Sequence, residues 1–133
     1  MVREILFKAK RKDDGKWVEG YYEKRFDVDG NEQHFIFWAK SYTVWEYAEI
    51  DPETLFQYTG LSDKNGKKIW ENDVLVEKHK GIVTVKYRAV FDLEEGAWML
   101  ETKSGARYGI GAVNQRNYEV IGNIFDNPEL LEV

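Results

Sequence analysis

The residues with catalytic potential are few and widely spaced. The chain has no cysteine, two histidines (His34 and His79) and three serines. None of the serines, which are Ser41, Ser62 and Ser104, lies in the Gly-x-Ser-x-Gly turn that exposes a hydrolase nucleophile. Without thiolates, a zinc site needs both histidines together with carboxylates gathered by the fold. We therefore expect no enzyme activity, no bound metal and no cofactor.

Acidic segments with a glycine offer a second kind of chemistry, the binding of calcium. A loop of the EF-hand type needs an oxygen ligand at its first position and a bidentate glutamate at its twelfth. When Gly66 is aligned with the glycine of such a loop, these two positions fall on Leu61 and Asn72. The segment around Gly30 fails at the same two positions. Hairpin turns are the better interpretation of both segments.

Cations near tryptophans are the strongest chemical signal in the sequence. Residues 8–12 carry four basic side chains before Trp17, and residues 64–68 carry three before Trp70. Cations neutralise phosphates and aromatic rings stack on bases, so both stretches could bind nucleic acid. Lysines are also common on sheet edges, and a net charge of −5 is wrong for a dedicated nucleic-acid binder. The candidate interaction residues are Trp70, Trp17, Lys10, Arg11, Lys12, Lys67 and Lys68, and Trp70 is expected to be the most exposed tryptophan.

The composition indicates more aromatic side chains than one small core needs. Aromatic residues make up 15% of the 133 residues. We expect some of these rings, with Trp45 and Trp98 among the candidates, to lie in a groove or a subunit interface, and the protein to be a homo-oligomer. No stretch is apolar enough for a signal peptide or a membrane span, so a soluble cytoplasmic protein with no membrane contact is expected.

Tight-turn sequences divide the chain into short strands. Asp13-Asp14-Gly15 joins residues 5–7 to residues 17–22 and predicts a β-hairpin. Further turns are expected at residues 29–31, 63–66 and 94–96. The clearest strand is residues 81–87, in which Val83, Val85 and Tyr87 share one face.

Two short helices are predicted where a capping residue precedes proline, at Asp51-Pro52-Glu53 and at Asn127-Pro128-Glu129. The glycines of residues 105–111 predict a flexible or sharply bent loop. The sequence assigns no structure to residues 39–50.

Three longer stretches form a pattern that spans nearly the whole chain. They are Arg3 to Lys10 with Asp14 to Tyr21, then Ile50 to Thr54 through Gln57 to Leu61 and Asp63 to Val74, and finally Glu119 to Leu131. In this order they resemble the YopX family of phage and prophage proteins. Asn72 departs from the pattern, which commonly has glycine there. Because asparagine tolerates a positive φ, we expect the turn to survive.

The resemblance implies a fold that contains a small barrel similar to that of SH3 domains. We expect a partly open barrel at residues 55–125, with N-terminal hairpins at residues 1–54 packed on it. A short C-terminal helical turn is expected at residues 126–133. The whole chain, residues 1–133, is predicted to be a single compact and mainly β domain.

The resemblance also implies a phage-encoded protein made in a bacterial host cell, with no established activity and no site residues to carry over. The surplus of rings, the separation of acidic from basic stretches and the shortage of catalytic groups favour a non-enzymatic interaction module. We expect it to self-associate and to contact a host or phage protein. The alternative is a nucleic-acid-binding accessory protein that uses its basic hairpins and exposed rings.

Overall fold

The computed structural model describes residues 3–110 and 117–131 of the chain. These residues form mainly antiparallel β-sheet, which confirms the prediction of a mainly β fold. The chain divides into two compact units, Met1–Tyr58 and Thr59–Val133, here called the N-terminal and C-terminal units. Their organisation as one domain stays a prediction. No helix among the described residues is long and apolar enough to cross a membrane.

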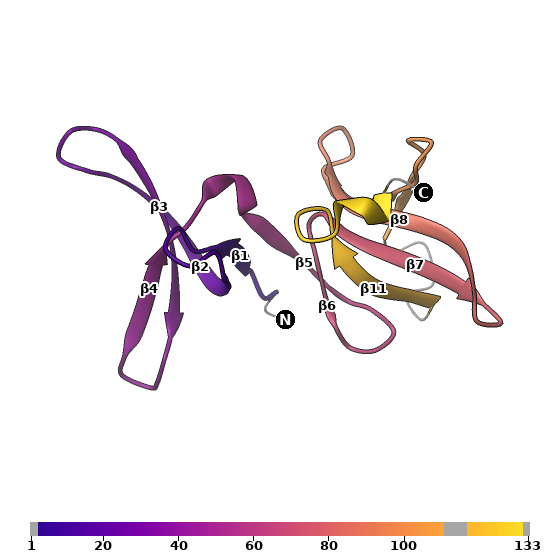
Figure 1. The fold of residues 1–133 in the computed structure, drawn as a ribbon, viewed down its shortest axis with the longest axis horizontal. Coiled ribbons are helices and arrows are strands. Elements are labelled where there is room, and N and C mark those ends of the chain that lie inside the picture. Colours follow the sequence, from indigo (N-terminus) through magenta and orange to yellow (C-terminus); the bar gives the residue numbers. More distant parts are fainter. Residues whose placement is uncertain (1–2, 111–116, 132–133) are drawn as a thin grey trace. The chain divides into compact units, whose positions relative to one another are not determined.

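The N-terminal unit is a sheet of successive hairpins (Figure 1). Its elements are β1 (Phe7–Lys10), β2 (Trp17–Phe26), β3 (Glu32–Ala39), β4 (Trp45–Glu49), the 3-10 helix η1 (Pro52–Thr54) and the start of β5 (Phe56–Ser62). The strand order is β4-β3-β2-β1-β5, and every pair in it is antiparallel. The hairpin predicted at residues 13–15 is therefore confirmed. Residues 39–50, unassigned from the sequence, contain strand β4.

The core of the N-terminal unit lies on one face of this sheet. Ala9, Ile36 and Ile50 are fully buried there, and five partly buried apolar side chains pack around them. Gly20 permits the strands to approach closely, because a Cβ at this position would collide with the backbone carbonyl oxygen of Phe37. The core is small, so much of the apolar surface of this unit lies outside it.

The C-terminal unit holds the second sheet (Figure 1). Its elements after β5 are β6 (Lys68–Trp70), β7 (Asp73–His79), β8 (Ile82–Asp92), β9 (Ala97–Glu101), β10 (Arg107–Gly109), β11 (Tyr118–Asn123) and the 3-10 helix η3 (Pro128–Leu131). The strand order is β10-β9-β8-β7-β11, and β6 lies next to β5. Across residues 3–110 and 117–131 neither sheet closes into a barrel.

The core of the C-terminal unit is larger than that of the N-terminal unit. Its buried members are Ile69, Leu75, Tyr87, Ala89, Leu100, Ile110, Tyr118 and Val120. Three consecutive residues of β7, Val74 to Val76, are almost completely buried. Because neighbouring side chains of a strand point to opposite faces, both faces of β7 are covered.

A buried carboxylate ties the first turn of the C-terminal unit to its last strand. One oxygen of Asp63 accepts the backbone N–H groups of Asn65 (2.8 Å) and Lys67 (2.9 Å). Its other oxygen accepts the N–H of Val120 in β11 at 2.9 Å. Burial by itself raises the pKa of Asp63, but these three N–H groups and the charge of Lys67 outweigh it and hold the pKa below its ordinary value.

Most local sequence predictions are confirmed. Both predicted helix starts form 3-10 helices, and the Asp51 side chain caps the first by accepting the Glu53 N–H. The turn at Asn72 has the expected positive φ, 67°. One of these local predictions was wrong: residues 107–109 of the expected glycine-rich loop form β10, because they pair with residues 99–101 of β9. Gly111 lies outside the described residues.

Candidate interaction face

The predicted basic hairpin places two lysines over a tryptophan. Lys10 lies opposite Trp17 in the β1–β2 pair. The Lys8 and Lys10 ammonium groups are 4.8 Å and 5.3 Å from the centre of the Trp17 ring, within the range of cation–π attraction. Trp17 is half-buried. The hairpin therefore presents a cationic cluster over one side of an indole ring.

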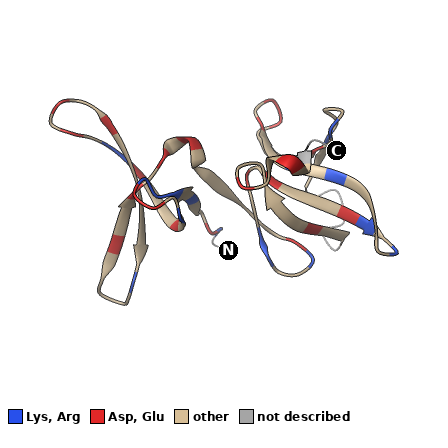
Figure 2. Ribbon diagram, in the orientation of Figure 1, with Lys and Arg blue, Asp and Glu red and all other residues tan. Residues whose placement is uncertain are grey.

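Acidic side chains neutralise the rest of this hairpin. Arg11 makes two 2.9 Å hydrogen bonds to the Asp13 carboxylate, and Lys12 lies 3.6 Å from Glu49. The hydrogen bond raises the pKa of Arg11 and lowers that of Asp13. Figure 2 shows this mixture of basic and acidic segments along the N-terminal unit. A surface of both signs suits a protein partner better than it suits a row of phosphates.

The second predicted site, around Trp70, differs from expectation. Trp70 is only 4% exposed, so its expected exposure was wrong. Its backbone N–H donates to the buried carboxylate of Asp73, which holds the end of β6 inside the fold. Lys67 lies exposed in the turn before β6, and Lys68 begins that strand. These two lysines therefore do not stand beside an exposed tryptophan ring.

A row of rings lies on the face of the N-terminal sheet opposite its core. The strand register brings Tyr21, Phe37 and Tyr47 side by side across β2, β3 and β4. Phe35 and Trp45 lie on the same face, because each is two residues from one of these. We call these five side chains the aromatic face.

Ring contacts join the aromatic face in two groups, Phe35 with Phe37 and Tyr47, and Tyr21 with Trp45. The centroids of Phe37 and Tyr47 are 5.4 Å apart, those of Phe35 and Tyr47 are 6.0 Å apart, and those of Tyr21 and Trp45 are 6.0 Å apart. Tyr21 and Trp45 are each 56% exposed, and Tyr47 is 64% exposed. Exposed rings in contact with one another form an apolar patch of the kind that marks binding surfaces.

One ion pair lies on the aromatic face. The Arg25 guanidinium lies 5.7 Å and 5.3 Å from the ring centres of Phe35 and Phe37. Its Nε donates to the Glu23 carboxylate at 2.8 Å, and this hydrogen bond raises the pKa of Arg25 and lowers that of Glu23. The face therefore combines apolar rings with this ion pair, and the strand register also places Glu49 opposite Phe35 on the same side.

Sequence reasoning named Trp17 and Trp45 but missed Tyr21, Phe35, Phe37 and Tyr47. In residues 35–38 every side chain is apolar, so no alternation shows which of them face the core. The signal that could have found the face is the spacing of two between Trp45 and Tyr47. It lies in the segment that the sequence analysis left unassigned.

The two histidines, considered from the sequence as possible metal ligands, lie in different units. His34 Nδ1 is 2.6 Å from the Tyr22 hydroxyl, and its Nε2 is 3.4 Å from Glu32. His79 ends strand β7 in the other unit. Among the described residues, no group of three or more histidine and acidic side chains is placed to hold a metal ion.

Comparisons with known proteins give a family and a fold. The family model described as YopX protein matches residues 6–132. The crystal structure of protein EF1440 from Enterococcus faecalis is similar over 98% of this chain and 99% of that one, with a TM-score of 0.58 and 24% identity. Protein yopX from Bacillus subtilis is similar over 96% of both chains, with a TM-score of 0.51 and 15% identity. No curated protein matches.

Proposed function

The chain belongs to the YopX protein family, and we propose that it acts as a non-enzymatic interaction module that self-associates through the aromatic face. The family resemblance predicted from the sequence is confirmed by the match over residues 6–132. One observation carries the functional proposal. Three of the five rings are more than half exposed, although the opposite face of the same strands encloses a core. Aromatic side chains that stay in contact with water do not stabilise a monomer, whereas an interface removes their apolar surface from water.

The partner that fits this face best is a second copy of the chain. A two-fold interface places the same surface against itself, so it must carry both charges of every pair it forms. The aromatic face meets this condition, because it carries both Arg25 and Glu23, which we propose exchange partners between the two copies. Among the described strands, β4 ends its sheet and contains neither lysine nor proline, the residues that usually block pairing at an edge.

The remaining parts of the proposal follow the family resemblance. We propose that the C-terminal unit is a partly open SH3-like barrel and that the protein works in the cytoplasm of a phage-infected bacterium. There the assembled copies contact a further host or phage protein. The support is the family resemblance and the compactness of the C-terminal unit.

Light scattering coupled to size-exclusion chromatography tests self-association. The unmodified chain is expected to form a discrete dimer that persists in high salt, because ring burial is not screened. The double variant Trp45→Ala, Tyr47→Ala should be a folded monomer. The matched control is Tyr42→Ala, which removes a fully exposed ring from the turn before β4 and should leave the dimer intact. A monomeric unmodified chain at the highest soluble concentration would refute the proposal.

Nucleic-acid binding is a second candidate, favoured by the two lysines over Trp17. Replacement of Lys10, Arg11 and Lys12 by alanine should abolish binding to mixed DNA and RNA oligonucleotides. Binding by the unmodified chain should also weaken steeply with salt. Fluorescence anisotropy at two salt concentrations measures both effects. Unchanged affinity in the triple variant would end this candidate.

A further inference from the structure

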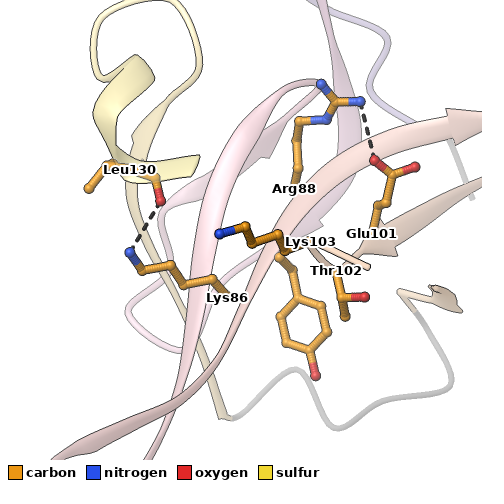
Figure 3. A pocket seen from close by; sticks show the side chains of 7 residues that line it. Lys86, Arg88, Glu101, Thr102, Lys103 and Leu130 are labelled. Carbon is orange, nitrogen blue, oxygen red and sulfur yellow. Dashed lines mark hydrogen bonds and ion pairs between the residues drawn. The ribbon is translucent and has the colours of Figure 1, made fainter. Parts of the chain in front are cut away.

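A small pocket opens on the C-terminal unit (Figure 3). Its lining includes Lys86 and Arg88 of β8, Glu101 at the end of β9, Thr102 and Lys103 directly after it, and Leu130 of η3. Its volume is about 220 Å³. We call it the basic pocket. It shares no residue with the aromatic face and belongs to the other unit.

The basic pocket carries more positive than negative charge. Three of its lining residues are cations, and one, Glu101, is an acid. Glu101 is shared between two arginines, since it lies 3.4 Å from Arg88 and 2.8 Å from Arg107 outside the pocket. Lys86 donates to the backbone carbonyl of Leu130 at 3.1 Å, a contact that leaves its charge uncancelled. An anion in the pocket would be attracted by this excess of positive charge.

Arg88 adds a specific donor. Its Nε is buried, and none of the described residues accepts a hydrogen bond from it. Because that atom is closed to solvent, the groups that can meet a ligand are the other N–H groups of the guanidinium, one of which lies 3.4 Å from Glu101. The guanidinium presents its N–H groups in a planar fork that matches two oxygens of a phosphate. Lysines supply point charges to the same kind of ligand.

The surroundings of the basic pocket leave room for more than a bare ion. An adjoining hollow of about 370 Å³ shares Lys86, Thr102 and Lys103 with the pocket. Val83 and Val85 give this hollow apolar walls. We propose that the basic pocket binds the phosphate group of a small phosphomonoester, such as a nucleoside monophosphate, with the organic part of the ligand in the adjoining hollow.

Titration of the full-length chain with AMP, adenosine and inorganic phosphate, followed by two-dimensional amide NMR, tests this site. AMP should bind saturably and shift the amide signals of residues 83–88 and 101–104. Inorganic phosphate should shift a subset of the same signals more weakly, and adenosine should shift none. Lys103→Gln should weaken AMP binding about tenfold, and Arg88→Lys, which keeps the charge but removes the fork, about threefold.

The control is Lys40→Gln, which removes the same charge from an exposed turn of the N-terminal unit and should leave AMP binding unchanged. Lys86 is left unchanged because it holds η3 through Leu130. Equal shifts with AMP and adenosine, or equal loss of affinity in Lys40→Gln and Lys103→Gln, would overturn the proposal. So would binding of a single-stranded oligonucleotide without saturable binding of AMP.

Discussion

Tyrosines serve opposite purposes in the two units. In the C-terminal unit Tyr87 and Tyr118 meet edge to face inside the core, with ring centres 5.5 Å apart. In the N-terminal unit Tyr21 and Tyr47 lie on the aromatic face, more than half exposed. The first pair of rings is part of a core, whereas the second pair lies on an open face of a sheet.

This difference indicates that the packing against a sheet face, more than the sequence of its strands, decides whether an aromatic ring stabilises the fold or is available for binding. Strand β7 is buried on both faces, whereas β2, β3 and β4 enclose a core of only three fully buried residues on one face. A ring on a covered face contributes stability, and a ring on an open face is available for binding.

Truncation of one ring in each unit gives the largest expected contrast. Tyr118→Ala should lower the free energy of unfolding by about 4 kcal/mol, because it empties a large, fully buried site. Tyr47→Ala should cost under about 1 kcal/mol and instead weaken self-association. Urea unfolding at one protein concentration measures both variants. Equal losses of stability would show that the aromatic face is structural.

The buried carboxylate of Asp63 stabilises the C-terminal unit alone. Asp63→Ala should cost about 3 kcal/mol, because three backbone N–H groups lose their acceptor. Hydrogen exchange should then show faster opening of β11 and of the turn at residues 63–66, while amides of β2 and β3 keep their protection. A uniform loss of protection in both units would contradict this.

The same residue predicts how stability depends on pH. The pKa of Asp63 is lowered by folding, so its contribution is fully present above its unfolded pKa of about 3.9. That contribution is lost as the pH falls through the lower pKa of the folded state. Asp63→Asn should therefore flatten the acid limb of the stability curve below about pH 4. An unchanged acid limb would assign it to other carboxylates.

The close approach of β2 and β3 at Gly20 holds the strands that carry the aromatic face. Gly20→Ala should destabilise the N-terminal unit by about 2 kcal/mol, because its Cβ would meet the backbone carbonyl of Phe37. The displacement of β3 should also weaken self-association. The control Gly15→Ala has no nearby atoms and carries only the strain of φ 71°, so it should cost about half as much and spare assembly. Amide exchange in β2 and β3 measures the local effect.

Much of the fold could be predicted from the sequence because turns are local. Glycine and asparagine at positive φ, and proline after a capping residue, act within four residues, so the hairpin at Asp13 to Gly15 and both short helices were placed correctly. The aromatic face could not be predicted in full. Which side of residues 35–38 is covered depends on Ala9 and Ile50, which are distant in sequence.

One long-range contact and one contact missed within a short segment explain the other failures of sequence reasoning. Asp63 was identified as a turn residue, but its bond to Val120 joins positions 57 residues apart. Trp70 follows a basic turn typical of a surface, yet the buried Asp73 carboxylate holds its backbone inside. No local pattern predicts the contact of Asp63 with Val120, whereas the bond of Trp70 to Asp73 spans only three residues and was missed because the basic turn before Trp70 indicated a surface.

Asn72, in the turn between β6 and β7, is the position that departs from the family pattern, and substitutions there test its role. Asn72→Ala should cost about 1 kcal/mol because of the positive φ, and Asn72→Gly should be nearly neutral. The backbone of Asn72 donates to Ala89 and accepts from Ile124, so strain there should reach β8 and the end of β11. Thermal melts of both variants measure the effect. A glycine variant as unstable as the alanine one would show that the Asn72 side chain itself matters.

The smallest expected effect comes from removing the Tyr118 hydroxyl group, which separates its contribution to stability from that of the ring. Burial raises the pKa of Tyr118, and its hydroxyl has no hydrogen-bond partner among the described residues. Tyr118→Phe should therefore leave the free energy of unfolding within about 0.5 kcal/mol of its original value or raise it, because no hydrogen bond is lost. Tyr87→Phe is the matched control and should cost about 1 kcal/mol, since the Tyr87 hydroxyl donates to Glu77 at 3.2 Å. Urea unfolding compares the two variants, and a larger loss in Tyr118→Phe than in Tyr87→Phe would mean that the buried rings of the C-terminal unit act through their hydroxyls as well as their apolar surface.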